Sequence, residues 1–316
     1  MWAPDVLEDF KRLAGTGRME IAAETYHHSL AFFYDREEFS RQVKLHEDKI
    51  QQTFGLTPKV LRNTELAYNN ELGYWAQEAG YKGVLAEGWD PILGWRSPNF
   101  MYHPAGAPNI KLLLKNYKLS DDIAFRFGDK NWQEWPLTAD KFTHWLDETG
   151  EADFFNLFMD FETFGEHQWE DKGIFSFLEH LPRAWLRDHH YSFLTFSDAI
   201  EHFHAVDEVD VPYTVTWADT ERDLTAWLGN PMQHQAAESL YSISKKIIHS
   251  GDQQLVDDWR KLQISDHLYY MCTKWFADGD VHAYFSPYDS PYDALINYMN
   301  VFQDIRYRLS KNGVHH

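Results

Sequence analysis

Short apolar runs without polar alternation recur along the first two thirds of the chain, and they constrain the fold more than any other feature. The segments GVLAE at 83–87, IKLLLKNY at 110–117 and DFFNLFMDFE at 153–162 are of this kind. A strand with one solvated face alternates apolar and polar residues, whereas a strand covered on both faces is almost continuously apolar. We therefore expect strands that are buried between layers of helices.

Helical patterns lie between these runs. Residues 36–54 place apolar side chains at helical spacing and end before Gly55, and further helical stretches are predicted around 140–148 and 174–186. Ser197 is positioned to cap another helix after the segment YSFLTF. This alternation of strands and helices predicts an α/β protein with a parallel sheet or barrel.

The last third of the chain has a different rhythm. Long helical patterns cover residues 231–248, 253–271 and 290–310, and no linker rich in glycine and serine precedes them. We therefore predict two closely docked parts, a (β/α) barrel over 1–228 and a helical bundle over 229–316.

Composition excludes several classes of partner. The formal net charge of −20 argues against binding to nucleic acid or to anionic membrane. No run approaches the roughly 18 apolar residues of a membrane span, and the N-terminal segment MWAPDVLEDF is too acidic for a signal peptide. Cys272 is the only cysteine, so no intrachain disulfide can form, which favours a cytoplasmic location. The oligomeric state is left open by the sequence.

Carboxylates follow the strand-like runs at their ends. Glu65 ends the run VLRNTE, Glu87 ends VLAE, and Asp160 and Glu162 end FNLFMDFE. The carboxyl ends of parallel strands are where functional side chains gather in α/β folds. A buried carboxylate is costly unless it is paired, so each of these residues either pairs with Arg or Lys, caps a helix, or belongs to a site.

The segment FFNLFMDFETFGEHQWE has the greatest density of such groups. Strand alternation would place Asp160 and Glu162 on the same side, among apolar and aromatic neighbours. Such surroundings raise the pKa of one carboxyl group while a second, solvated carboxylate stays ionised. Two carboxylates with separate roles are the minimum equipment for glycoside hydrolysis. The aromatic content of 16% agrees with a sugar substrate but also with a large aromatic core.

A metal site is the main alternative for these residues. His27, His28, Asp160, Glu166 and His167 offer imidazole and carboxylate ligands. Adjacent histidines on a strand point to opposite faces, however, and the sequence contains no HExxH or HxH spacing and no cysteine cluster. We therefore expect a site without a metal ion.

Seven segments, in order, resemble conserved segments of glycoside hydrolase family 57, particularly its α-amylase-like branch. They are ETYHHSL (24–30), LRNTELAYNNELGYW (61–75), SPNFMYH (97–103), SDDIAFRF (120–127), MDFETFGEHQW (159–169), TWADTERDLTAWLGNPMQ (216–233) and TKWFADGDVHAYFSPYDSPYDALINYMN (273–300). SDHLYYM at 265–271 mixes charge with aromatic residues and is either a solvated helix start or part of a site.

The resemblance implies a distorted (β/α)7 barrel followed by a helical bundle, and retaining hydrolysis of α-1,4-glucans such as maltooligosaccharides without a cofactor. It makes Glu65 the nucleophile and Asp160 the general acid/base. We expect their carboxyl groups about 5–5.5 Å apart, the spacing of retaining glycosidases. The residues that it would place around the sugar are Glu24, His28, His167, Trp217 and Asp219.

The sequence departs from the family pattern at its start. The family begins with a strand that carries a His-Gln-Pro segment, and no HQP is present here. We therefore expect an incomplete barrel that lacks its first one or two strand–helix units, and the activity of the chain is an open question at this point. The alternatives are a 4-α-glucanotransferase and a non-catalytic homologue that binds α-glucan.

Overall fold

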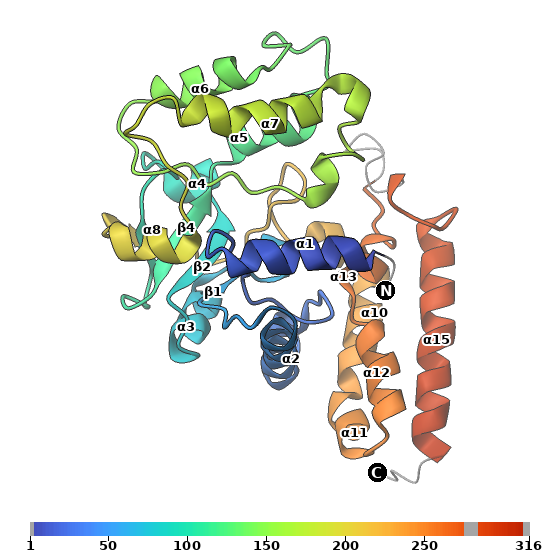
Figure 1. Cartoon of the computed structure of the whole chain (residues 1–316). Coiled ribbons are helices and arrows are strands. Elements are labelled where there is room, and N and C mark those ends of the chain that lie inside the picture. The colour runs from blue at the N-terminus through green and yellow to red at the C-terminus, as the bar shows by residue number, and fades with distance from the viewer. Residues whose placement is uncertain (1–2, 275–283, 312–316) are drawn as a thin grey trace. The chain divides into compact units, whose positions relative to one another are not determined.

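The computed structural model describes residues 3–274 and 284–311, and the chain forms two compact units (Figure 1). The first unit contains the chain up to Glu20 and Gly73–Pro212, and the second contains Ile21–Leu72 and the chain from Tyr213 onward. Neither unit is continuous in sequence, because the chain leaves each unit and returns to it.

Two predictions are not tested by this division. The predicted boundary separates a barrel over 1–228 from a helical bundle over 229–316. The two units are defined by compactness and not by fold type, so this boundary stays a prediction. Part of the family-like segment 273–300 lies outside the described residues, which omit 275–283.

The sheet of the first unit has the strand order β2-β4-β3-β5. Strands β2 and β4 run parallel with Glu87 opposite Lys115, β3 is antiparallel to β4, and β3 is parallel to β5. The bounds are β2 Gly83–Glu87, β3 Tyr102–Pro104, β4 Lys111–Lys115 and β5 Asp207–Val209. All of β2 and the last four residues of β4 are buried, so the strands predicted at 83–87 and 110–117 are confirmed.

Helices precede, separate and follow these strands along the chain. They are α1 Pro4–Gly15, α4 Asp90–Leu93, α5 Tyr117–Asp121, η3 Asp122–Arg126, α6 Ala139–Asp147, η4 Phe161–Thr163, η5 Glu170–Lys172, α7 Ile174–Trp185 and α8 Phe196–His202, while α3 Asn70–Glu78 begins in the second unit. Helices α6 and α7 lie side by side (Figure 1), with the rings of Phe142 and Phe177 5.9 Å apart. The α/β class and the helices predicted around 140–148 and 174–186 are therefore confirmed.

The strand predicted over 153–162 is wrong. The segment before η4 has no regular strand, because its polar backbone groups bond individually rather than in a ladder. The N–H of Phe158, for example, donates to the hydroxyl of Ser120 at 3.2 Å. The chain then turns directly into η4, so strand alternation does not place Asp160 and Glu162 on a common face.

The cap of α8 is Thr195 rather than the predicted Ser197. The Thr195 hydroxyl accepts the N–H of Asp198 at 3.2 Å, and the Asp198 carboxylate accepts the N–H of Thr195 at 3.3 Å, which completes a capping box. Ser197 instead donates its N–H and hydroxyl to Glu20 at 2.8 and 2.6 Å. Serine and threonine are both common N-cap residues. The hydrogen bonds between Ser197 and Glu20, which is distant in sequence, leave Thr195 as the cap.

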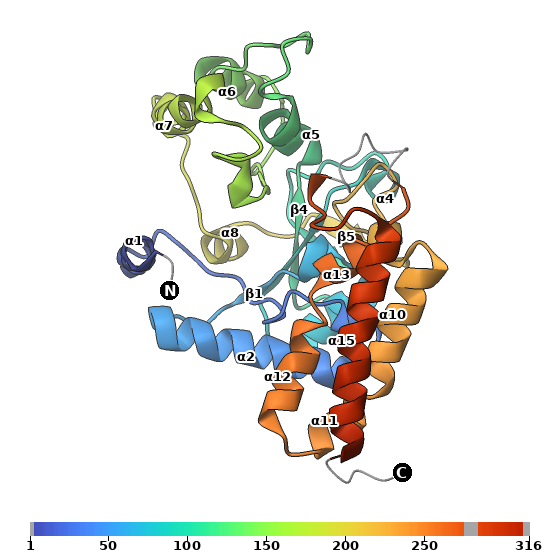
Figure 2. The same ribbon diagram turned by 90° about the vertical axis from the view of Figure 1, so that its right-hand side faces the viewer.

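The second unit consists mostly of helices. Its elements are η1 Ala31–Phe33, α2 Arg36–Phe54, β1 Val60–Leu61, η2 Thr64–Leu66, α9 Thr225–Leu228, α10 Pro231–Ser242, α11 Ser244–His249, α12 Gln253–Lys261, α13 Ser265–Tyr269 and α15 Pro291–Lys311. Helices α10, α12 and α15 pack side by side (Figure 2), and the indole of Trp259 on α12 donates to the carbonyl of Leu240 on α10 at 2.9 Å. No helix in the part of the chain that the structure describes is long and apolar enough to cross a membrane.

The helix predicted over 36–54 is confirmed, with Asp35 as its N-cap and Gly55 in the left-handed region at φ 70° as its C-cap. The predicted helices 231–248 and 253–271 are each divided in two. The first breaks at Ile243, after which the hydroxyl of buried Ser244 donates to the Asp35 carboxylate. Because this contact joins segments far apart in sequence, helical periodicity alone could not indicate the break.

Gly88 follows β2 at a point where the backbone has no room for a side chain. A Cβ there would lie 2.2 Å from the carbonyl oxygen of Lys115 and 2.9 Å from the Cβ of Pro98. We predict that Gly88→Ala lowers the free energy of unfolding by about 1–3 kcal/mol, the usual cost of overpacking. Urea unfolding followed by circular dichroism measures this. Gly15→Ala is the control, because a Cβ at Gly15 meets nothing within 4 Å, and equal stability of the two variants would contradict the prediction.

Candidate active site

Glu65 lies on a tight turn directly after β1. It has φ 58° and ψ 24°, and the next residue, Leu66, has φ 54°, so both occupy the left-handed region that non-glycine residues seldom adopt. Such residues cost on the order of 1–3 kcal/mol each and persist only where the surroundings fix them. Here the side-chain amide of Asn63 closes the turn by donating to the carbonyl of Ala67 at 2.9 Å. The backbone therefore sets the direction of the Glu65 side chain.

His28 lies on a second strained turn, with φ 48°. Its N–H donates to the Thr25 carbonyl at 3.0 Å, and the N–H of Ser29 donates to the Thr25 hydroxyl at 2.8 Å. The Thr25 hydroxyl is also 2.8 Å from the hydroxyl of Thr64, the residue before Glu65. Because Thr25 and Thr64 are both buried, this bond joins the two strained turns in a region without water to compete.

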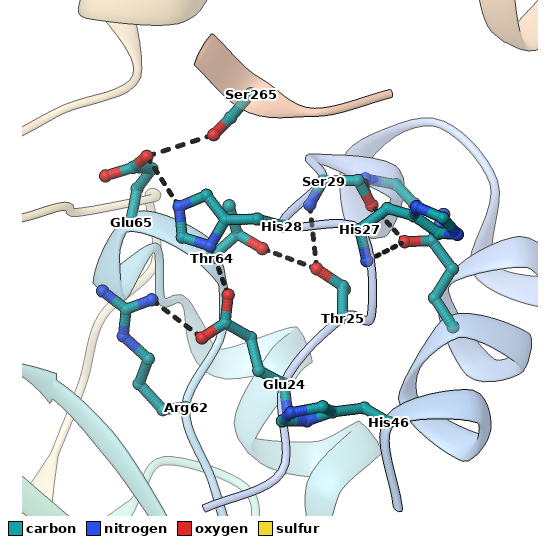
Figure 3. A network of polar contacts seen from close by, with 12 residues as sticks. Glu24, Thr25, His27, His28, Ser29, His46, Arg62, Thr64, Glu65 and Ser265 are labelled. Carbon is teal, nitrogen blue, oxygen red and sulfur yellow. Dashed lines mark hydrogen bonds and ion pairs between the residues drawn. The ribbon is translucent and has the colours of Figure 1, made fainter. Parts of the chain in front are cut away.

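The imidazole of His28 bridges two carboxylates (Figure 3). Its Nδ1 is hydrogen-bonded to Oε1 of Glu24, and its Nε2 lies 3.0 Å from Oε1 of Glu65. An ionised carboxylate only accepts hydrogen bonds, so both ring nitrogens of His28 must carry a proton. The bridge therefore requires a positively charged imidazolium.

Arg62 and Trp217 close this bridge into a ring of contacts. Arg62 Nη1 donates to Oε2 of Glu24 at 3.0 Å, and its guanidinium lies 4.8 Å from the centre of the Trp217 ring. The indole N–H of Trp217 donates to Oε2 of Glu65 at 3.1 Å. The ring thus runs through Glu24, His28, Glu65, Trp217 and Arg62, and its two negative and two positive charges balance.

This charge balance sets the protonation states. Burial alone would raise the pKa of Glu65, but its hydrogen bond to His28 and the charges of His28 and Arg62 outweigh burial and lower that pKa. The pKa of Glu24 is lowered in the same way, chiefly by the charge of Arg62 and the bond from His28. Burial would lower the pKa of His28, but the bonds to Glu24 and Glu65 raise it to about 10. At neutral pH both carboxylates are ionised and His28 is protonated.

Three residues of the site were not among those predicted to line it, namely Arg62, Ser265 and Asp266. The Ser265 hydroxyl donates to Oε1 of Glu65 at 3.1 Å, and its N–H donates to the carbonyl of His28 at 2.9 Å. Burial and then the negative charge of Glu65 raise the pKa of Asp266. The signal that could have found the last two is the segment SDHLYYM, whose charge among aromatic residues left a functional role open.

Asp219 lies on the same segment as Trp217 but has a different partner. Its carboxylate is 3.4 Å from Lys274 Nζ, which also lies 3.2 Å from Glu221. Asp219 has φ 55°, and Arg222, which donates to the Trp217 carbonyl at 2.6 Å, has φ 53°. The segment after Trp217 is thus a third strained turn, and a contact between Asp219 and a sugar stays a prediction.

Asp160 and His167 lie together on a compact loop of the first unit. The carbonyl of Asp160 accepts the N–H of Thr163 at 3.1 Å, and the N–H of His167 donates to the carbonyl of Glu162 at 2.9 Å. The Asp160 residue is exposed and His167 is half-buried. Because Glu65 belongs to the second unit, its separation from Asp160 stays a prediction.

Glu87, the other carboxylate at a strand end, is paired. Its buried carboxylate lies 3.7 Å from Nζ of Lys115, which is also 3.4 Å from Asp121. Glu87 therefore pairs with a lysine, one of the alternatives that the sequence left open, because a buried carboxylate needs a cation.

His27 and His28 are adjacent in sequence, but their surroundings shift their pKa values in opposite directions. Burial and the charge of Arg260 lower the pKa of His27, whereas both ring nitrogens of His28 face carboxylates. Among the residues that the structure describes, no three His, Cys, Asp or Glu side chains lie close enough together to hold a metal ion.

Comparison with known proteins identifies the family. The model of glycosyl hydrolase family 57 matches residues 1–212. A protein of Methanocaldococcus jannaschii named "Putative alpha-amylase" is 42% identical over 318 residues, which cover 97% of this chain and 67% of that protein. The chain belongs to glycosyl hydrolase family 57.

Solved structures of family 57 enzymes share the fold. A branching enzyme from Pyrococcus horikoshii has a TM-score of 0.71 at 14% identity, over 98% of this chain and 73% of that one. A 4-alpha-glucanotransferase from Thermococcus litoralis has a TM-score of 0.67 at 17% identity, over 84% of this chain and 47% of that one. The α/β fold of the family, a (β/α)7 barrel in these enzymes, agrees with the sequence prediction.

The bridging geometry predicts an unusual titration for His28. We expect its imidazole to stay protonated until the pH approaches about 10, against an ordinary value of 6.5. Its contribution to the free energy of unfolding should then be fully present below 6.5 and be lost as the pH rises through about 10. Nitrogen-15 NMR of labelled histidines measures the titration, with Glu24→Gln expected to lower the value because one carboxylate partner is lost. A His28 that titrates near its ordinary value would show that the bridge does not form in solution.

Proposed function

We propose that this chain is a retaining glycosidase that cleaves α-1,4-linked glucans, with Glu65 as nucleophile and Asp160 as general acid/base. The observation that carries the proposal is the ring of contacts that holds the half-buried Glu65 ionised and fixed in direction. A carboxylate nucleophile must be deprotonated and aligned with the anomeric carbon before the sugar arrives. Family membership and the α-amylase-named relative supply the substrate class.

The two oxygens of Glu65 differ in a way that suits this role. Oε1 accepts from both His28 and Ser265, so its two lone-pair directions are used. Oε2 accepts from the indole of Trp217, and within the described part of the chain no second donor to it is found. We infer that Oε2 attacks the anomeric carbon. The imidazolium and the indole keep the carboxylate in the required orientation as its charge is transferred to the new bond.

The proposed reaction then runs in two displacements. Asp160 protonates the oxygen of the departing sugar while Glu65 forms a covalent glycosyl ester. Asp160 next takes a proton from water, which attacks the same carbon from the side that the leaving group vacated. The ester bond to Glu65 breaks, its carboxylate is released, and the product keeps its α configuration. The proposal requires the two carboxyl groups to flank one glycosidic bond at about 5–5.5 Å. Glu24, His28, His167, Trp217 and Asp219 are proposed to contact the sugar.

Glucan transfer is the second candidate function. It uses the same covalent intermediate, and a second glucan rather than water accepts the glycosyl group. The likeness to a branching enzyme and to a 4-alpha-glucanotransferase motivates it. The third candidate is an α-glucan-binding protein without catalysis.

Two further proposals concern the location of the protein and the charge of its substrate. A cytoplasmic location stays a proposal, supported by the single cysteine of the sequence, Cys272, which leaves no intrachain disulfide to form. The acidic net charge of −20 supports a neutral glucan rather than a polyanion as the partner.

Incubation with maltoheptaose tests the proposed function. Hydrolysis predicts shorter oligosaccharides only, released first as the α anomer, which proton NMR detects. Glu65→Gln should reduce turnover by about 10⁴-fold or more, because the other carboxylate of the ring, Glu24, is held by His28 and Arg62. Longer products beside shorter ones would establish transfer instead, and binding without any products would establish the non-catalytic alternative. Loss of activity with EDTA would contradict the mechanism without a metal.

The role of Asp160 predicts a dependence on the leaving group. Asp160→Asn should slow the cleavage of natural glucans by about 10²–10⁴-fold, because the departing alkoxide loses its proton donor. The first step on an aryl α-glycoside with an acidic phenol should be much less affected, since that phenolate departs without a proton. Burst kinetics with both substrates measure the two effects. Equal losses on both substrates would show that Asp160 is not the acid.

A further inference from the structure

Gln42 on α2 is completely buried, and its amide makes four hydrogen bonds. Its Nε2 donates to Oε1 of Glu38 at 3.1 Å and to Oε1 of Gln263 at 2.8 Å. Its Oε1 accepts from the hydroxyl of Ser29 at 2.9 Å and from the N–H of His27 at 3.4 Å. A glutamine amide has two donors and two acceptor positions, so every one of them is used.

A neighbouring ion pair fixes which way the amide points. Glu38 is buried and accepts two hydrogen bonds from Arg260, at 2.7 and 3.1 Å, with Arg41 a further 3.5 Å contact. An ionised carboxylate cannot donate, so the NH₂ group of Gln42 must face Glu38. The carbonyl oxygen of the amide consequently faces the loop that contains His27 and Ser29.

Gln42 holds this loop on both sides of His28. In addition to the bonds from His27 and Ser29, the main-chain carbonyl of Gln42 accepts the N–H of Tyr26 at 3.2 Å. Figure 3 shows His27, His28 and Ser29 on one loop, with His28 reaching towards Glu65 and Ser29 turned away from it. One residue thus anchors the three neighbours of His28.

His28 needs such an anchor for two reasons. Its left-handed backbone, with φ 48°, relaxes unless the surroundings hold it. Its ring must also reach Glu24 with one nitrogen and Glu65 with the other, so a small rotation lengthens one of the two bonds. We propose that Gln42 is a positioning residue for the nucleophile, because it holds the 26–29 loop so that His28 bridges Glu24 and Glu65. This inference rests on the proposed role of Glu65.

The charged groups around His28 are those of the ring and its neighbour. Glu24 and Glu65 contact its nitrogens, Arg62 lies beyond Glu24, and the charge of Asp266 also acts on it. Gln42 changes none of these charges, so any effect of Gln42 on the titration of His28 must act through the position of the ring.

A pair of matched variants tests the proposal. Gln42→Leu removes the amide that anchors the loop. Gln233→Leu is the control, because Gln233 is also completely buried and its amide makes four hydrogen bonds, at 2.8 to 3.1 Å, none of them to the 26–29 loop. Both variants should lose stability, which urea unfolding measures, so a general loss of stability is common to the two.

Only Gln42→Leu should disturb the nucleophile. We expect the pKa of His28 in that variant to fall from about 10 towards 6.5 in the histidine NMR titration. In kinetics on maltoheptaose, kcat should fall about 10²-fold, as small misplacements do, with little change in KM and an alkaline limb that moves to lower pH. Gln233→Leu should keep the titration and the pH profile of the unaltered protein.

Two results would overturn the proposal. One is a His28 titration in Gln42→Leu that matches the unaltered protein, and the other is an equal effect of both variants on the titration. If Gln42→Leu does not fold, Ser29→Ala decides, since it removes one bond from the loop to Gln42, and an unchanged His28 titration there overturns the proposal. The NMR titration needs no substrate. Inactivity on glucans would therefore contradict the proposed function, while the role of Gln42 could still be tested.

Discussion

Two half-buried carboxylates, Glu24 and Glu65, need opposite charge, and His28 supplies it to both at once. A carboxylate taken out of water without a partner either becomes neutral or destabilises the fold. The imidazolium shared by these two, together with Arg62 beside Glu24, keeps both ionised. The proposed role of Glu65 as nucleophile requires an ionised carboxylate, so the contacts that stabilise the fold also meet the chemical condition of that proposal.

This arrangement requires strained backbone conformations. In the described part of the chain, the non-glycine residues with positive φ are His28, Glu65, Leu66, Asp219 and Arg222. All of them belong to the second unit, on the three turns that carry the ring residues or follow directly after them. Strained residues persist where neighbouring contacts over-determine them. The Thr25–Thr64 hydroxyl pair and the amides of Asn63 and Gln42 supply those contacts here.

Proteins named for different reactions are related to this chain. The relatives that share the fold include a branching enzyme, a 4-alpha-glucanotransferase and an α-amylase-named protein. Hydrolysis and transfer share the covalent intermediate and differ in the acceptor that reaches it. Under the proposed mechanism the ring around Glu65 acts on the formation of that intermediate, so we expect this part of the site to be independent of the acceptor.

The sequence by itself determined the α/β class, the family, the buried strands 83–87 and 110–117, the helix 36–54 and the segments that carry Glu24, His28, Glu65 and Trp217. These depend on apolar periodicity and on local motifs, which a linear sequence displays. Only the tertiary structure decided that Thr195 rather than Ser197 caps α8, that the segment before Asp160 is not a strand, and that Arg62 and Ser265 join the site. It also decided the charge of His28. Each of these depends on a partner distant in sequence, because hydrogen bonds and electrostatic interactions act across space and leave no periodic trace along the chain.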